Sequence, residues 1–149
     1  MYNIQGDASG SGLYTIDITT GLATLVGSDI AFADGLGINS AGQAFAANAI
    51  DDILYSVDLT TGLLTAIGGF GVNLQDQTGL SFDETGALWM LTSRGEIYTL
   101  DTGTGAATFV ANTLDGMEGL AINPIPEPGA ATLFGISVLV GSIFCRRRA

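Results

Sequence analysis

The sequence predicts an all-β fold followed by one C-terminal membrane helix. Two observations predict the β fold. A unit of roughly 40 residues recurs along the chain, and its apolar residues alternate with polar ones, which is the period of a β-strand. A third observation, an uncharged apolar run that ends in three arginines, predicts the helix. Together these features indicate a partial β-propeller of about three four-stranded blades plus a transmembrane segment.

The repeat consists of two blocks, and each block reads as a β-hairpin. The first block occurs as LYTIDITTGLATLVG from Leu13, LYSVDLTTGLLTAIG from Leu54 and IYTLDTGTGAATFVA from Ile97. The second occurs as DGLGINSAGQAFAA from Asp34, TGLSFDETGALWML from Thr78 and EGLAINP from Glu118. Repeats of this length are typical of propellers and solenoids. A β-solenoid is the rival, but its repeats are usually shorter and its strands parallel, so we favour the propeller.

A turn that begins with Asp and ends with Gly joins the two strands of each first block. Its three copies are Asp17–Gly21, Asp58–Gly62 and Asp101–Gly105. An Asp carboxylate at the start of a turn can accept hydrogen bonds from the backbone N–H groups that follow it. Glycine supplies a position with positive φ. We therefore expect the three aspartates to cap these turns and the three glycines to have positive φ.

The four strands of a propeller blade are labelled a to d from the innermost to the outermost. Counting strands in this way gives three blade equivalents. Residues 35–68 and 79–111 each supply four strands, residues 1–27 supply b, c and d, and residues 119–123 supply a lone a strand that could complete the first blade. Propellers usually have four to eight blades, so a three-blade arc leaves apolar faces open at both ends. Two explanations remain: the chain is the C-terminal part of a longer protein, or two arcs assemble into a six-bladed ring.

Composition excludes several classes of function. The net charge is −11, and Arg94 is the only basic residue before the C-terminal arginines, so we expect no nucleic-acid binding. The chain has no histidine, which excludes Ser-His-Asp catalysis and the usual zinc sites. Its one cysteine, Cys145, lies in the apolar tail, so no intrachain disulfide is possible.

The C-terminal tail divides into three parts after a body of residues 1–124. Residues 125–129 form a Pro-Glu-Pro linker, residues 130–145 an uncharged helix, and residues 146–149 a basic end. Sixteen helical residues span about 24 Å, and flanking arginines can extend this towards a bilayer core of about 30 Å. A helix packed on the body is the alternative, but the run is apolar on all sides. By the positive-inside rule Arg146, Arg147 and Arg148 stay in the cytoplasm and anchor the helix.

This tail resembles the PEP-CTERM sorting signal of Gram-negative bacteria. Pro126, Glu127 and Pro128 match its motif, and the apolar helix and arginine-rich end follow in the same order. The resemblance implies export, transient retention in the inner membrane, and processing by an exosortase near the motif. The product would reach the cell surface or an extracellular exopolysaccharide matrix. The family normally has an N-terminal signal peptide, and MYNIQGDASGSG is not one, which favours a missing start.

The body is predicted to be a non-enzymatic binding or structural module, since no catalytic constellation stands out. The alternative is a calcium-dependent propeller enzyme, such as a lactonase-like hydrolase or a lyase. Asp34 and Glu118 stand at equivalent positions before the inner strands and could offer Ca²⁺ hard oxygen ligands. Glu118 in MEGLAI resembles the Glu-Gly motif that carries a metal ligand in gluconolactonase-like propellers. No other cofactor is predicted.

Overall fold

The computed structural model describes residues 1–5, 12–28, 33–74, 77–117 and 119–122. Within these residues the chain forms β-strands joined by turns and contains no helix. The strands are β1 (Tyr2–Gln5), β2 (Gly12–Ile16), β3 (Ala23–Gly27), β4 (Gly35–Ile38), β5 (Ala44–Asn48), β6 (Ile53–Val57), β7 (Leu64–Gly69), β8 (Thr78–Phe82), β9 (Leu88–Thr92), β10 (Glu96–Leu100) and β11 (Ala107–Asn112).

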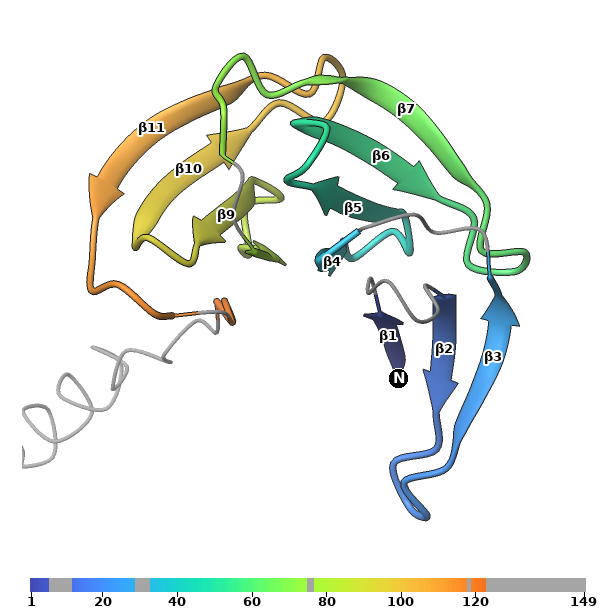
Figure 1. The fold of residues 1–149 in the computed structure, drawn as a ribbon. Coiled ribbons are helices and arrows are strands. Elements are labelled where there is room, and N and C mark those ends of the chain that lie inside the picture. Colours follow the sequence, from blue (N-terminus) through green and yellow to red (C-terminus); the bar gives the residue numbers. More distant parts are fainter. Residues whose placement is uncertain (6–11, 29–32, 75–76, 118, 123–149) are drawn as a thin grey trace, which may run out of the picture.

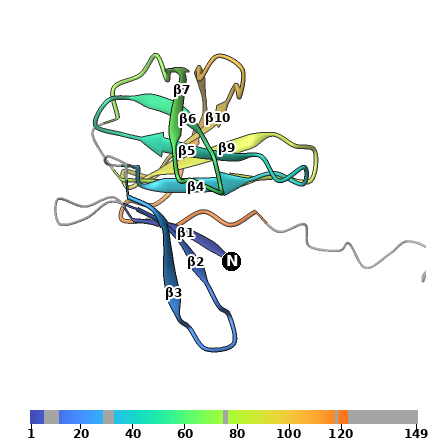
Figure 2. The same ribbon diagram turned by 90° about the vertical axis from the view of Figure 1, so that its right-hand side faces the viewer.

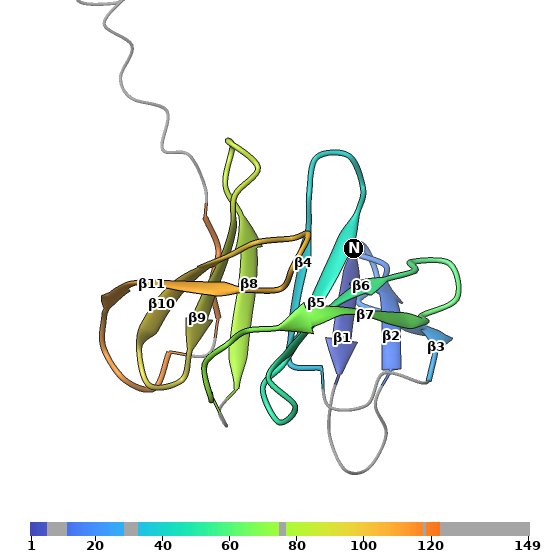
Figure 3. The ribbon, with the colours of Figure 1, turned by 90° about the horizontal axis from the view of Figure 1, so that it is seen from above.

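The strands form three antiparallel sheets in which neighbours in sequence are neighbours in space. The first blade is β1-β2-β3, the second β4-β5-β6-β7 and the third β8-β9-β10-β11. Figure 1 shows the three sheets as an arc, with β3, β7 and β11 along its outer rim. The inner strands β4 and β8 lie side by side, as Figure 3 shows from above. These observations confirm an all-β, blade-like architecture for the described residues.

The sequence repeat is also a repeat of strand register. Leu13 pairs with Gly27, Leu54 with Gly68 and Ile97 with Ala111, and a register shift follows each of these pairs. A shift of this kind bends and twists the outer strands, which suits a curved blade. Equivalent positions of the three blades can therefore be compared residue by residue.

Two hydrophobic clusters hold the blades together. One lies between the second and third blades and includes Leu54, Phe70 and Met90, and the other lies between the first and second and includes Ile4 and Leu13. Burying one such side chain fully contributes about 1.5–3 kcal/mol. The inner strand β4 has glycine where the third blade packs closely against it, since a Cβ on Gly37 would lie 3.1 Å from Leu88 Cδ1. This is the crowding expected near the axis of a propeller.

The structure corrects one prediction, the lone inner strand at residues 119–123. Its described part, residues 119–122, has no strand geometry and does not complete the first blade. Ile122 instead donates its N–H to Ser81 Oγ of β8 at 3.1 Å. A side chain of the third blade thus satisfies this amide, and Pro124, two residues later, has no N–H to give to a ladder.

The predicted sorting tail lies outside the described residues. This applies to the linker 125–129, the helix 130–145 and the basic end 146–149, with Pro126, Glu127, Pro128 and Arg146–Arg148. Among the residues that are described, no helix has the length and apolar character needed to cross a membrane.

Candidate functional site

The repeated aspartates cap the outer hairpin turns, as predicted. Asp58 Oδ1 accepts hydrogen bonds from Thr60 N at 2.8 Å, Thr60 Oγ1 at 2.7 Å and Thr61 N at 3.3 Å. Asp17 and Asp101 accept the corresponding backbone N–H groups. These hydrogen bonds, led by the Thr60 hydroxyl at Asp58, lower the pKa of all three carboxyl groups. The three carboxylates therefore serve the turns.

The three turn glycines have the predicted backbone conformation. The φ angles of Gly21, Gly62 and Gly105 are 74°, 77° and 82°. Their surroundings differ, because Gly62 and Gly105 are buried whereas Gly21 is exposed. The turns are thus alike in shape, but the first of them is not covered by another blade.

The start of the inner strands holds one of the two candidate calcium ligands. Asp34 is half-buried, and burial raises the pKa of its carboxyl group. The next residue, Gly35, packs against the third blade: a Cβ there would lie 3.0 Å from the Thr78 carbonyl oxygen. Thr78 is 2% exposed, and its Oγ1 has no hydrogen-bond partner among the described residues. The start of β4 therefore lies against Thr78, the first residue of β8.

Glu118, the second candidate ligand, lies outside the described residues. Within the described part of the chain, no group of three His, Cys, Asp or Glu side chains is arranged to hold a metal ion. Asp34 is thus the one described member of the predicted calcium pair.

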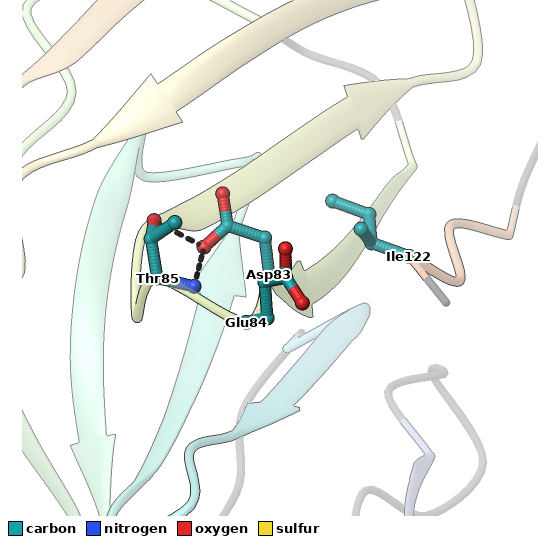
Figure 4. A pocket seen from close by; sticks show the side chains of 4 residues that line it. All are labelled: Asp83, Glu84, Thr85 and Ile122. Atoms are coloured by element: carbon teal, nitrogen blue, oxygen red, sulfur yellow. Dashed lines mark hydrogen bonds between the residues drawn. The ribbon is translucent and has the colours of Figure 1, made fainter. Parts of the chain in front are cut away.

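A small hollow of about 170 Å³ lies beside the β8–β9 turn and is lined by Asp83, Glu84, Thr85 and Ile122 (Figure 4). Asp83 Oδ1 accepts Thr85 Oγ1 at 2.7 Å and Thr85 N at 2.9 Å, and Oδ2 accepts Trp89 Nε1 at 2.8 Å. The bonds from Thr85 and Trp89 lower the pKa of Asp83 to about 2. A carboxylate held this way is a poor general base at neutral pH.

The aromatic residues Trp89 and Tyr98 lie on β9 and β10 of the third blade. The indole N–H of Trp89 is committed to Asp83. Tyr98 is 6% exposed, and its ring meets Phe109 edge-on at a centroid distance of 5.7 Å. The buried Tyr98 ring thus has no open face on which a sugar could stack.

Sequence reasoning missed Asp52, which organises the connection from the second to the third blade. Asp52 has a φ of 55°, where the equivalent residue of the third blade is Gly95 with a φ of 79°. Its Oδ1 accepts Leu74 N and its carbonyl oxygen accepts Phe70 N, both at 2.8 Å. Aligning Asp52 with Gly95 would have revealed the unusual backbone conformation. The bond to Leu74 joins residues 22 positions apart in the sequence, so it leaves no local signal.

Comparison with known proteins gives a fold and no family. No protein-family model and no curated protein matches the sequence. A protein of unknown function from Bacteroides thetaiotaomicron is similar, at 11% identity over 72% of this chain and 29% of its own, with a TM-score of 0.60. The calcium-binding protein regucalcin from Agrobacterium tumefaciens is 18% identical over 72% of this chain and 38% of its own, with a TM-score of 0.49.

TolB from Acinetobacter baumannii is 19% identical over 72% of this chain and 28% of its own, with a TM-score of 0.48. The chain therefore spans about three tenths to two fifths of the length of these structures. At such identities the likeness concerns the fold alone.

Proposed function

We propose that this chain is an exported, surface- or matrix-associated β-propeller protein with a binding or structural role and no catalytic one. The observation that carries the proposal for the body is the use of its repeated carboxylates. Asp17, Asp58, Asp101 and Asp83 all accept hydrogen bonds from their own turns. Side chains engaged in this way build blades and are not available for proton transfer.

In this proposal, the C-terminal tail directs the protein to the cell surface. We infer that Pro126, Glu127 and Pro128 are recognised by an exosortase, after the apolar run and Arg146–Arg148 have held the chain in the inner membrane. Proline disfavours helix at its own position and at the residue before it, so we expect an extended segment whose backbone an exosortase could reach at the membrane surface. The arginines resist translocation at about 2.5–3.5 kcal/mol each on insertion scales.

The sorting role is tested by fusing residues 124–149 to an exported reporter in a bacterium that has an exosortase. The reporter is expected first in the inner membrane and then in a released form shortened near the motif. Replacing Pro126, Glu127 and Pro128 by Ala should keep the membrane form and abolish the shortened one, whereas Pro124→Ala, the matched control, should leave processing intact. Unchanged processing in the triple variant, or in a strain without the exosortase, would contradict the proposal.

A calcium-dependent hydrolase or lyase is the second candidate, and one observation favours it. The half-buried Asp34 carboxyl precedes Gly35, which packs against Thr78, and the buried Thr78 hydroxyl has no hydrogen-bond partner among the described residues. Side-chain oxygen atoms, which Ca²⁺ prefers, thus occur at the start of both inner strands. Calorimetric titration of the chain with Ca²⁺ separates the two functions. Tight binding that is lost in both Asp34→Asn and Glu118→Gln would favour the enzyme, and the absence of binding would favour the binding or structural module.

A further inference from the structure

Neighbouring blades of this chain touch through the backbones of paired glycines. The end of β3 lies against the β6–β7 turn, where a Cβ on Gly62 would come 2.9 Å from the Gly27 Cα. The end of β7 meets the β10–β11 turn in the same way, and a Cβ on Gly105 would come 2.6 Å from the Gly68 carbonyl carbon. Real Cβ atoms essentially never lie this close to backbone atoms. The contact therefore needs glycine on both sides.

An apolar side chain from the turn accompanies the glycines in the first of these contacts. Leu59, the residue after the capping aspartate, packs against the cluster between the first and second blades, which contains Ile4 and Leu13 of the first blade. The β6–β7 turn thus contributes an apolar side chain to the cluster between the two blades and a glycine backbone to the contact with the outer strand of the preceding blade.

The β2–β3 turn of the first blade repeats this half of the contact, but no described residue lies against its glycine. Ile18 corresponds to Leu59, and Gly21 corresponds to Gly62, with φ angles of 74° and 77° for the two glycines. No described atom lies within 4 Å of a Cβ built on Gly21, and Ile18 is 81% exposed. Figure 2 shows this hairpin extending away from the other two blades.

The third blade lacks the glycine that would let a second copy fill this place. Ala111 pairs with Ile97 as Gly27 pairs with Leu13, so it occupies the equivalent position at the end of the outer strand. A Cβ on Gly27 would overlap the Thr61 carbonyl oxygen and lie 2.9 Å from its carbonyl carbon. Ala111 carries such a Cβ, which would meet the β2–β3 turn of another copy in the same way.

We propose that the Ile18–Gly21 turn is a docking surface for one further β-blade from a partner that is not a copy of this chain. The partner blade is a four-stranded antiparallel sheet whose outer strand carries glycine where β3 and β7 carry Gly27 and Gly68. The contact continues an interface that already occurs twice within the chain. It does not depend on the sorting tail or on calcium.

The test supplies such a blade covalently, as a second copy of residues 34–87 joined in front of Met1 of the full chain. This copy contains the second blade, its connection and an inner strand for the first blade. It also reproduces the junction before Leu88, the equivalent of Met1. One control carries Gly68→Ala in the added copy. A matched control carries Gly69→Ala there, since a Cβ on Gly69 meets only Asp52 O, at an ordinary 3.6 Å.

Thermal unfolding should show a Tm at least about 4 °C above that of the unextended chain. Gly68→Ala in the added copy should remove most of this rise, and Gly69→Ala should keep it. No rise, or an equal rise with either alanine, would overturn the proposal. Sedimentation of the unextended chain provides a second arm. Self-association that Ile18→Glu abolishes would overturn the proposal by making a second copy the occupant, whereas its absence, with association appearing in Ala111→Gly, would support it.

Discussion

The backbone of Gly68 at the end of β7 lies directly against the backbone of Gly105 in the β10–β11 turn of the next blade. Gly27 and Gly62 repeat the relationship one blade earlier. In both pairs the turn glycine has positive φ, so it supplies the turn geometry and the close approach at once. The arc is therefore built from one contact used twice.

Valine substitutions at the turn glycines should separate the need for positive φ from the need for close contact between blades. Gly21→Val strains only the backbone, because no described atom lies within 4 Å of a Cβ built there, and it should cost about 1–3 kcal/mol in the free energy of unfolding. Gly62→Val adds a clash with Gly27 and should cost more. Urea unfolding of the two variants measures the difference. A larger loss at Gly21 would show that the two turns are not distinguished by the blade contact.

The capping role of Asp52 predicts a difference between two substitutions. Asp52→Ala loses the acceptor for Leu74 N and keeps the strained φ of 55°, so stability should fall by about 1–3 kcal/mol. Asp52→Asn should lose less, because asparagine tolerates this conformation and its side-chain oxygen can accept the same N–H. Chemical denaturation measures both variants. Equal losses would assign the effect to charge and not to capping.

The lowered pKa of Asp83 predicts stability that depends on acid pH. Its folded-state pKa is about 2, below the ordinary value of 3.8. The carboxylate therefore stabilises the fold above pH 3.8, and this contribution is lost as pH falls towards about 2. Asp83→Asn should be less stable than the parent chain at neutral pH, with a gap that closes over this window. Glu84→Gln, its exposed neighbour, is the control and should show no such convergence.

Asp34 should behave in the opposite sense. Burial raises its pKa above the ordinary value of 3.8, so the ionised form carries a cost in the folded state. That cost is present above the folded-state pKa and disappears as pH falls below 3.8. Asp34→Asn should therefore raise the Tm at pH 7 and leave it nearly unchanged at pH 3. A lower Tm at pH 7 would show that the carboxylate has a stabilising partner.

The blades and turns could be predicted from the sequence because the same pattern of strands and turns occurs three times. Asp17, Asp58 and Asp101 mark the turns, and period-two alternation marks the strands around them. Both signals are local, so they survive without knowledge of the tertiary structure. The pairing of each turn with the blade before it could not be predicted, since a glycine in the sequence shows freedom of the backbone but not what lies against it.

Residues 119–122 show that a repeated sequence pattern alone does not guarantee a strand. Their Gly-Leu pattern matches the inner strands β4 and β8, yet Ile122 bonds to Ser81 of the third blade and pairs with no strand of the first. The Ile122 N–H could bond to the first blade or to the third, and only the spatial arrangement of the blades decides which of them it reaches. The sequence likewise could not predict that the buried hydroxyl of Thr78 has no hydrogen-bond partner among the described residues, because its position in the repeat gives no sign of this.

The most direct test of the glycine-built arc is a comparison of two adjacent alanine substitutions in β7. A Cβ at position 68 would lie 3.1 Å from the Thr104 carbonyl carbon and overlap its oxygen, whereas one at position 69 meets only Asp52 O at 3.6 Å. In urea unfolding, Gly68→Ala should lower the free energy of unfolding by about 1–3 kcal/mol or more. Gly69→Ala should be neutral or stabilising by up to about 1 kcal/mol. Equal stabilities for the two variants would contradict the account.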